Sequence, residues 1–183
     1  MRQAWLCISL YVCTFAAAAL GQCAATGPRT PDSIGDEVGR IYNETLDGMR
    51  HTLPSGVVAT TWRAPSDSVR AQIECLGPAA VPAIIELLQT SHRSFGPYLA
   101  VRMLGWAGGP GIVPPLAEIL SRSGDPLVGL KIEALESLVS APPDKALPIV
   151  QKVLRTEKNG MLLQQAASVE ARLEGQLQDG TIR

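Results

Sequence analysis

The sequence predicts an all-α protein in which helical hairpins stack into a solenoid. The main observation is an internal repeat: the segment 77–88 recurs 32 residues later as 109–120, and a more diverged copy runs from Pro143 to Leu154. Self-similarity with a period of about 20 to 50 residues is typical of proteins built from stacked supersecondary units. Two further observations support this class: each copy has helical periodicity, and a second apolar run precedes each copy.

The periodicity within each copy is that of an amphipathic helix. Apolar residues recur at i, i+3 and i+7, which places them on one face of a helix with 3.6 residues per turn. Pro82, Pro114 and Pro148 align as well. A proline is tolerated in the first turn of a helix, where its missing N–H has no partner, so these prolines predict three helix starts. The aligned apolar columns are Val81, Val113 and Leu147; Ile84, Leu116 and Val150; and Leu88, Leu120 and Leu154.

The apolar run upstream of each copy predicts a first helix, so that each repeat is a hairpin. The three hairpins are expected at about 67–90, 97–122 and 127–157. The pair Asp125-Pro126 suits the start of the third hairpin, because Asp is a good N-cap and Pro fits the first helical position.

Capping helices are predicted at both ends of a domain that covers 33–178. The N-terminal one follows helical spacing from Ser33 and ends near His51. The C-terminal one, at about 160–177, has a polar outer face, as terminal repeats require, and the tail beyond it is expected to fray. Between the first cap and the first hairpin, Leu53 to Asp67 is interpreted as a loop, since it holds Pro54, Ser55-Gly56 and Pro65. A brief extended segment within 57–62 is the alternative, although a lone strand there would have nothing to pair with.

The segment Leu-Gly-Pro-Ala-Ala-Val-Pro-Ala-Ile-Ile-Glu-Leu-Leu from Leu76 resembles the HEAT repeat family, in particular its short HEAT-like or phycobilisome-lyase-type form. The resemblance covers roughly Asp67 to Glu157 and implies a right-handed α–α superhelix. The chain departs from the family at Gly129, where Arg is common, and at Pro142-Pro143, which replaces a glycine turn. Such repeats serve many unrelated roles, so the resemblance indicates a fold more than a function. Other matching residues are Val69-Arg70, Gly109-Pro110, Val113-Pro114 and Gly124 to Val128.

The first 25 residues predict a cleaved secretory signal peptide, followed by a flexible linker at 26–32. A short basic start precedes an apolar run, and small residues follow it at Gly21 and Ala25, the two expected cleavage points. A retained anchor helix and a lipoprotein with a lipidated Cys23 are the alternatives. The sequence therefore predicts an exported protein, periplasmic or secreted.

The four cysteines define no disulfide framework. Cys7 and Cys13 would leave with the signal peptide, and Cys23 could pair with Cys75 in an oxidising compartment. Cys75 lies beside Leu76 on an apolar helix, where an unpaired cysteine commonly acts as a small hydrophobe. That interpretation is favoured.

Charge and motifs exclude several classes of function. Without Arg2 the chain has 15 basic residues against 17 acidic ones, and the basic ones are scattered, so a nucleic-acid partner is not expected. His51 and His92 have no companion at metal-ligand spacing, and the chain lacks phosphate-loop, Cys-x-x-Cys and His-Glu-x-x-His motifs. No cofactor, metal or catalytic residue is predicted.

The sequence therefore predicts a non-enzymatic scaffold that binds proteins. An accessory subunit of a lyase-type enzyme and a membrane-tethered adaptor are the alternatives. Trp62 and Trp106 could be binding hot spots, although packing between hairpins is favoured for both. The remaining candidates for a protein-binding rim share one alignment column on the second helices, which usually line the concave face in HEAT-like proteins; they are Glu86, Glu118 and Lys152.

Overall fold

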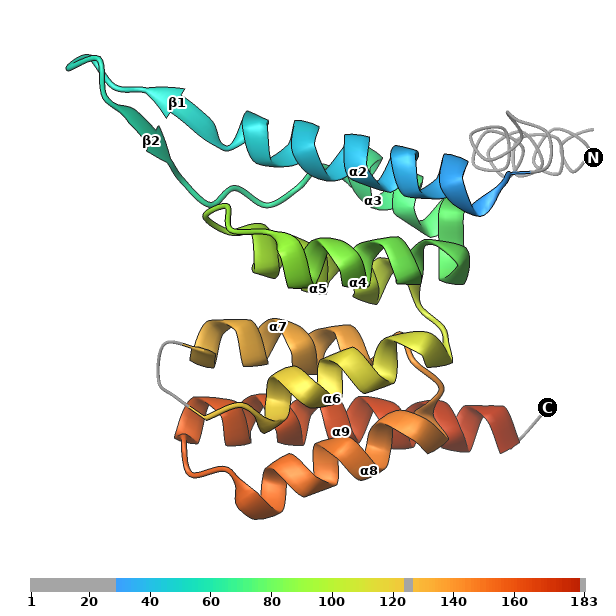
Figure 1. The fold of residues 1–183 in the computed structure, drawn as a ribbon. Coiled ribbons are helices and arrows are strands. Elements are labelled where there is room, and N and C mark those ends of the chain that lie inside the picture. The colour runs from blue at the N-terminus through green and yellow to red at the C-terminus, as the bar shows by residue number, and fades with distance from the viewer. Residues whose placement is uncertain (1–28, 124–126, 182–183) are drawn as a thin grey trace, which may run out of the picture. The chain divides into compact units, whose positions relative to one another are not determined.

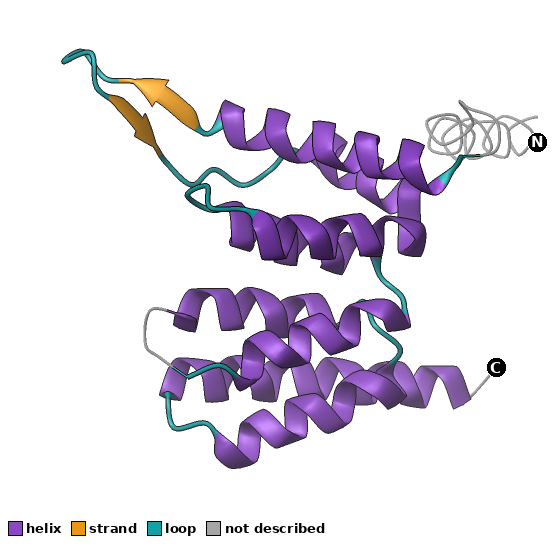
Figure 2. Cartoon of the chain, in the orientation of Figure 1, coloured by secondary structure: helices purple, strands orange, loops and turns teal. Residues whose placement is uncertain are grey.

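The computed structural model describes residues 29–123 and 127–181 of the 183-residue chain. The chain divides into two units, 1–30 and 31–183, and the fold described below is that of the second. The predicted signal peptide lies outside the described residues. Helices make up most of what is described, which confirms the all-α class (Figures 1 and 2). The helices are α2 (Pro31–Gly48), α3 (Asp67–Leu76), α4 (Val81–Thr90), α5 (Gly96–Ala107), α6 (Val113–Ser121), α7 (Val128–Leu138), α8 (Pro143–Thr156) and α9 (Gly160–Thr181).

The helices of this unit are arranged in two layers. In the first, α5 packs on α3 and α7, and α7 packs on α9. In the second, α2 packs on α4, and α6 packs on α8. Contacts of α4 with α5, of α6 with α7 and of α8 with α9 join the layers. Helix α2 thus packs against the second helix of the first hairpin (Figure 1).

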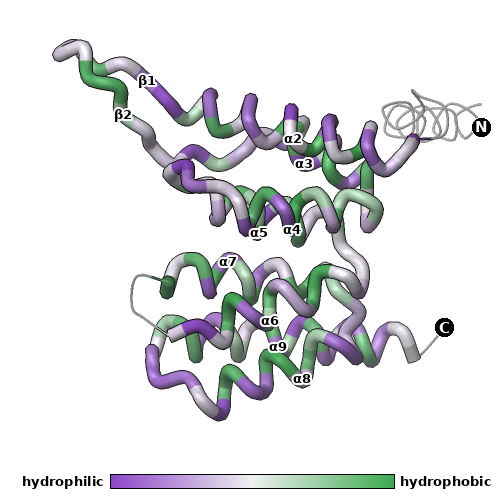
Figure 3. Tube along the Cα trace, in the orientation of Figure 1, coloured by the Kyte–Doolittle hydropathy of each residue, from purple (hydrophilic) through white to green (hydrophobic). Residues whose placement is uncertain are grey.

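The core lies between the two layers, and one of the three predicted apolar columns is buried along its whole length, whereas the other two are buried only in part. Ile84, Leu116 and Val150 are fully buried. Leu99 and Leu135 contribute equally buried side chains from the first helices of the next two hairpins. Figure 3 shows the same alternation, with hydrophobic positions recurring along each helix between hydrophilic ones.

The turns inside the first two hairpins are made by glycine, a short 3-10 helix and proline. Gly77 and Gly108 end α3 and α5 with φ of 57° and 67°, a region that favours glycine because it has no Cβ. The 3-10 turns η1 (Gly77–Ala80) and η2 (Pro110–Ile112) then lead into α4 and α6. Pro82 and Pro114 lie in the first turns of these helices, as predicted.

The third hairpin differs, and the prediction that Pro148 starts a helix is wrong. Helix α8 begins at Pro143, with Pro142 as its N-cap residue, and Pro148 lies inside it. The residues that form a 3-10 turn in the earlier hairpins are α-helical here, so the aligned proline comes a full turn later. Pro148 is exposed, and the Asp144 carbonyl that loses its helical partner can therefore bond to water.

The ends of the domain extend beyond the predicted bounds. Helix α2 begins at Pro31, inside the predicted linker, because proline suits a first helical position. Helix α9 continues to Thr181 where a frayed tail was expected. Its start is capped by Asn159, whose Oδ1 accepts hydrogen bonds from the backbone N–H of Met161 (3.0 Å) and Leu162 (3.3 Å).

A β-hairpin occupies part of the segment predicted to be a loop, and that prediction is wrong there. Strand β1 (Arg50–Thr52) pairs antiparallel with β2 (Val58–Thr60), with His51 opposite Ala59. Strand β1 is formed by residues that were predicted to be the end of the N-terminal helix. His51 therefore lies in a strand rather than at a helix end. Gly56, with φ of 81°, makes the turn and donates a hydrogen bond to the Leu53 carbonyl (2.8 Å).

One described stretch, Asp67–Thr90, is long and apolar enough to cross a membrane when judged by length and composition alone. It consists of two α-helices separated at Gly77 rather than one continuous helix. Ile73 and Ile84 within it are fully buried in the protein core, which accounts for its apolar character.

Candidate interaction surface

The three residues of the predicted rim lie on successive second helices and are all exposed: Glu86 on α4, Glu118 on α6 and Lys152 on α8. Glu118 accepts a hydrogen bond from Arg122 one turn later on the helix (2.8 Å). Of the three, Lys152 borders a cavity. The alignment of the internal repeats therefore identified Lys152, one residue of this cavity, although it did not predict the cavity itself.

This groove lies between α6 and α8, and we call it the α6–α8 groove. Its cavity volume is about 480 Å³, which falls within the range of sites that bind small molecules or single side chains. Leu120 and Val153 are almost fully buried, and with Ile149 they make an apolar floor. The polar lining consists of Arg122, Lys131, Lys152, Lys158, Glu157 and the hydroxyls of Ser121, Ser123 and Thr156.

The buried ion pair at the inner end of the groove is structurally satisfied. Lys131 is only 7% exposed, and its Nζ donates to Glu157 Oε2 at 3.2 Å. The other oxygen of Glu157 accepts hydrogen bonds from the backbone N–H of Lys158 (2.8 Å) and Asn159 (3.1 Å). These backbone N–H groups first, and then Lys131, hold the pKa of the Glu157 carboxyl below its ordinary value. The pair joins α7 to the loop between α8 and α9.

The cations at the mouth of the groove are less well compensated. Lys152 and Lys158 are exposed and make no ion pair within 29–123 and 127–181, whereas Arg122 is paired with Glu118. Lys131 is neutralised by Glu157. The groove therefore combines an apolar floor with two unpaired positive charges, in a chain whose net charge is −1.

Trp62 is held in an aromatic cluster rather than on a free surface. Its ring centroid lies 5.5 Å from that of Phe95 and 6.3 Å from that of Tyr98. The Arg102 guanidinium lies 5.7 Å above the indole, a cation–π distance. Arg102 also donates two hydrogen bonds to Glu133 on α7, at 3.0 and 2.8 Å. Trp62 thus anchors the segment after β2 to α5.

Trp106 borders a second cavity of about 480 Å³, on the first-helix layer. Charged groups there compensate one another: Arg102 pairs with Glu133, and Arg172 of α9 pairs with Glu136 at 2.7 Å. Trp106 lies on α5 and Trp62 packs against α5, in the layer formed by the first helices of the hairpins. The predicted rim residues lie instead on the second helices. The structure does not gather the five candidate residues into one site.

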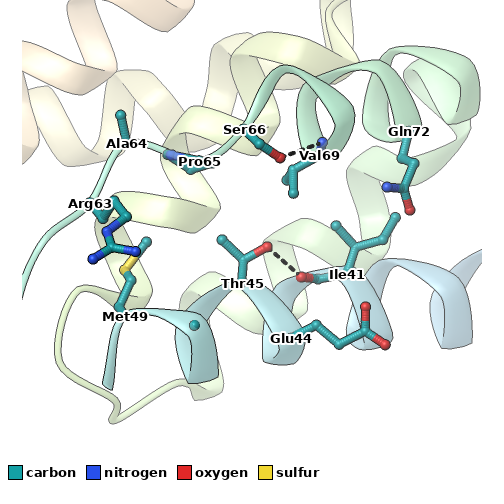
Figure 4. Close-up of a pocket in the computed structure, with 11 residues that line it drawn as sticks. Ile41, Glu44, Thr45, Met49, Arg63, Ala64, Pro65, Ser66, Val69 and Gln72 are labelled. Carbon is teal, nitrogen blue, oxygen red and sulfur yellow. Dashed lines mark hydrogen bonds between the residues drawn. The ribbon is translucent and has the colours of Figure 1, made fainter. Parts of the chain in front are cut away.

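A third, smaller groove of about 280 Å³ lies between α2 and the start of α3, at the base of the β-hairpin (Figure 4). Met49 and Val69 provide apolar walls, and Arg63 lies at one end. Figure 4 shows the two hydrogen bonds that fix its polar edges: Thr45 donates to the Ile41 carbonyl (2.7 Å), and Ser66 Oγ accepts from the Val69 N–H (3.4 Å) as the N-cap of α3.

Cys75 corrects the sequence interpretation. It is disulfide-bonded and half-buried, so the favoured interpretation as an unpaired small hydrophobe is wrong. Ile73 and Leu76 form the buried stripe of α3, and Cys75 lies beside that stripe rather than on it. Proximity to Leu76 in the sequence therefore did not imply burial. The other three cysteines, Cys7, Cys13 and Cys23, lie outside the described residues.

The described part of the chain contains no group of three His, Cys, Asp or Glu residues that could hold a metal ion. Both histidines are exposed. Sequence reasoning missed the contributions of Lys131 and Lys158 to the α6–α8 groove, because neither belongs to the repeat column that contains Lys152. The high density of Lys and Arg between 152 and 158 could have identified Lys158, but no comparable signal in the sequence marks Lys131.

Comparison of the chain with protein-family models, curated proteins and solved structures found no match.

Proposed function

We propose that this protein is an exported, non-enzymatic scaffold in which HEAT-like hairpins stack as a right-handed solenoid and the α6–α8 groove binds a segment of a partner protein. The observation that carries the proposal is the pairing of an apolar floor with the unpaired ammonium groups of Lys152 and Lys158. The repeat of 77–88 at 109–120 and the two layers of helices support the solenoid.

The chemistry of the groove favours one kind of occupant. A partner segment that presents an apolar side chain beside a carboxylate would remove the apolar floor from water and neutralise the two lysines. A purely apolar segment would leave both ammonium groups near a dry contact, which is unfavourable. The partner segment is therefore acidic and contains at least one apolar anchor residue.

Export is supported by the oxidation state of Cys75. Structural disulfides persist in oxidising compartments and are rare in the cytosol, and Cys75 is disulfide-bonded. The apolar run before Gly21 supplies the export signal in this proposal. N-terminal sequencing and the intact mass of the natively expressed protein test it: the mature chain begins within Gln22 to Thr26 and carries no lipid. A mass that includes Met1, or a diacylglycerol adduct at Cys23, would contradict it.

The binding site is tested by comparing affinity capture with three forms of the protein. The double variant Lys152→Glu, Lys158→Glu reverses the groove's unpaired charges. Arg155→Glu is the control. Arg155 is an exposed cation on α8, the helix that carries Lys152, but it does not line the groove. Proteins from the periplasmic or secreted fraction that bind the parent and the control but not the double variant are partners of the groove. Equal capture by all three forms would exclude it.

A further inference from the structure

Exposed apolar side chains are concentrated at the end of the β-hairpin, residues 53–58, which we call the hairpin tip. Leu53, Val57 and Val58 are 39%, 59% and 53% exposed. The other large hydrophobic residues that are exposed in the described chain, Met161 and Leu177, lie on α9 and are isolated from these. Single exposed hydrophobic residues are ordinary, but a cluster on a projecting element indicates an interaction site.

The tip is apolar on both faces. Successive residues of a strand point to opposite sides, so Val57 and Val58 face in opposite directions. Leu53 is opposite Val57 and donates a backbone hydrogen bond to its carbonyl (2.8 Å). The hairpin extends beyond the ends of the helices, so neither face of the tip is covered by the rest of the helical unit (Figures 1 and 2). Docking on a flat partner would cover one face only, whereas insertion covers both.

The charges around the tip have one sign. No charged residue occurs from Thr52 to Trp62, while Arg50 and His51 precede this stretch and Arg63 follows it. Arg63 makes no ion pair with any described residue, and Arg50 approaches its nearest carboxylate, that of Asp47, only to 4.0 Å. The same carboxylate accepts a hydrogen bond from Arg93. The base of the hairpin thus carries arginines that are incompletely compensated in a chain of net negative charge.

We propose that the hairpin tip inserts into the interface of an anionic lipid membrane, with Arg50 and Arg63 at the level of the lipid phosphates. The dimensions fit. A strand rises about 3.3 Å per residue, so the three steps from Thr52 to the turn at Ser55 span about 10 Å, and apolar groups of interfacial proteins penetrate about 5 to 10 Å. Arg50 precedes Thr52 by two residues and so lies nearer the base of the hairpin, where headgroup phosphates attract cations.

A membrane explains the tip better than a protein pocket does. A pocket that accepts Leu53, Val57 and Val58 gives no reason for the absence of acidic residues between Asp47 and Asp67. An anionic surface gives that reason, because a carboxylate at this position would be repelled. Insertion only as far as the interface also keeps the unpaired backbone groups of both strand edges hydrated. In the hydrocarbon core these groups would have no hydrogen-bond partners.

The test is co-sedimentation of the mature chain with vesicles, at low ionic strength, combined with hydrogen exchange. Vesicles of 30% phosphatidylglycerol in phosphatidylcholine should bind the protein at least tenfold more tightly than phosphatidylcholine alone. The double variant Val57→Ser, Val58→Ser should lose about tenfold or more of this binding, because the exposed apolar side chains supply the insertion. The matched control is Met161→Ser, Leu177→Ser, which removes exposed apolar groups elsewhere and should change binding less than twofold.

Hydrogen exchange distinguishes the tip from any other membrane-binding segment. With anionic vesicles, the amides of 53–58 should become protected in the parent and not in the Val57→Ser, Val58→Ser variant. Binding without protection of the tip would overturn the proposal. So would a change of oligomeric state in the tip variant without loss of vesicle binding, which would make the tip a contact between copies. Neither variant touches the buried core, so unchanged thermal unfolding verifies that both are folded.

The charged residues give an independent arm of the test. Arg50→Gln, Arg63→Gln should reduce binding to anionic vesicles about tenfold and leave the weak binding to neutral vesicles unchanged. Arg155→Gln is the control for loss of an exposed cation far along the chain. Equal loss of binding in the control would indicate a diffuse electrostatic effect and contradict the assigned role of the hairpin.

Discussion

Tyr42 donates a 2.5 Å hydrogen bond from its hydroxyl to Ser91 Oγ, which ties α2 to the residue that follows α4. The ring is only 2% exposed, and burial raises the pKa of the Tyr42 hydroxyl. Gly96, the first residue of α5, leaves the space for this bond: a Cβ there would lie 2.3 Å from Ser91 Oγ and 2.5 Å from Tyr42 Oη. The attachment of the N-terminal helix to the first repeat therefore depends on a glycine.

Gly96→Ala should destabilise the domain by about 1 to 3 kcal/mol, because the new methyl group must displace a partly buried hydrogen-bonded pair. Gly35→Ala is the matched control. Gly35 lies within α2 with no atom near the added Cβ, so alanine there should be neutral or stabilise by up to about 1 kcal/mol. Urea unfolding of both variants measures the difference. Equal stability of the two would mean that α2 and the Ser91 turn do not pack as described.

Ile84 and Glu86 provide a test of the helix face. Ile84 is fully buried, and Glu86, two residues on, is exposed. Ile84→Asp should lose about 2 to 5 kcal/mol of packing and also bury a carboxylate without a partner. Glu86→Arg should change stability by about 0.5 kcal/mol or less. Hydrogen exchange should show Ile84→Asp loosening α3, α4 and α5 before α9, and equal effects of both changes would place the stripe on the wrong face.

Glu157→Gln should destabilise the protein by about 1 to 3 kcal/mol at pH 7, since it removes a charged acceptor from three hydrogen bonds and leaves Lys131 unneutralised. The folded-state pKa of Glu157 is lowered, so its contribution is present above the unfolded value of about 4.3 and is lost as the pH falls through the folded value. The deficit of the variant should therefore be constant near neutrality and shrink below about pH 4.

The control for this pH dependence is Glu174→Gln, on α9, because Glu174 is exposed and makes no ion pair in the described chain. Its stability difference should be near zero at both pH values. Chemical unfolding of the two variants at pH 7 and pH 3.5 gives the comparison. A Glu157→Gln deficit that persists unchanged at pH 3.5 would show that the ionised carboxylate is not what stabilises the α8–α9 loop.

The oxidised state of Cys75 makes a prediction about the mature N-terminus. Cleavage after Gly21 leaves Cys23 as the one other cysteine of the mature chain, whereas cleavage after Ala25 leaves none. We therefore expect the chain to begin at Gln22 and peptide mapping without reductant to recover Cys23 linked to Cys75. Cys75→Ala should then lower stability by about 2 to 4 kcal/mol, and the difference should vanish when the parent is reduced. Alkylation of Cys75 in the native, unreduced protein would contradict this.

Much of the helical framework could be predicted because each helix carries its own signals. The columns of Ile84, Leu116 and Val150 indicate a buried face, and Gly77 with Pro82 marks a turn, so local chemistry places both helices of the first hairpin. Pro148 shows the limit: a first-turn position and an interior position of a helix are both possible for an exposed proline, and the choice depends on whether the preceding residues form a 3-10 turn or an α-helix.

The hairpin and the grooves depend on contacts that no single segment encodes. His51 can pair with Ala59 only if the chain stops being helical before β1. The hydrogen bonds to β2 are what make this favourable, and they cannot be read from the sequence of β1 alone. The α6–α8 groove brings Lys131 together with Lys158 through the ion pair of Lys131 with Glu157. Repeat alignment identified Lys152 but could not predict these neighbours, because they lie outside the repeated column.

The main packing partners of each helix are its neighbours one or two places away in the chain, such as α4 and α5, α5 and α7, or α8 and α9. The loops that must close during folding are therefore short, and little chain entropy is lost before the first contacts form. Proteins with such local contacts fold in microseconds to milliseconds. The helical unit can consequently gain structure as soon as each hairpin becomes available, so its apolar faces would be exposed to water only briefly while the chain folds.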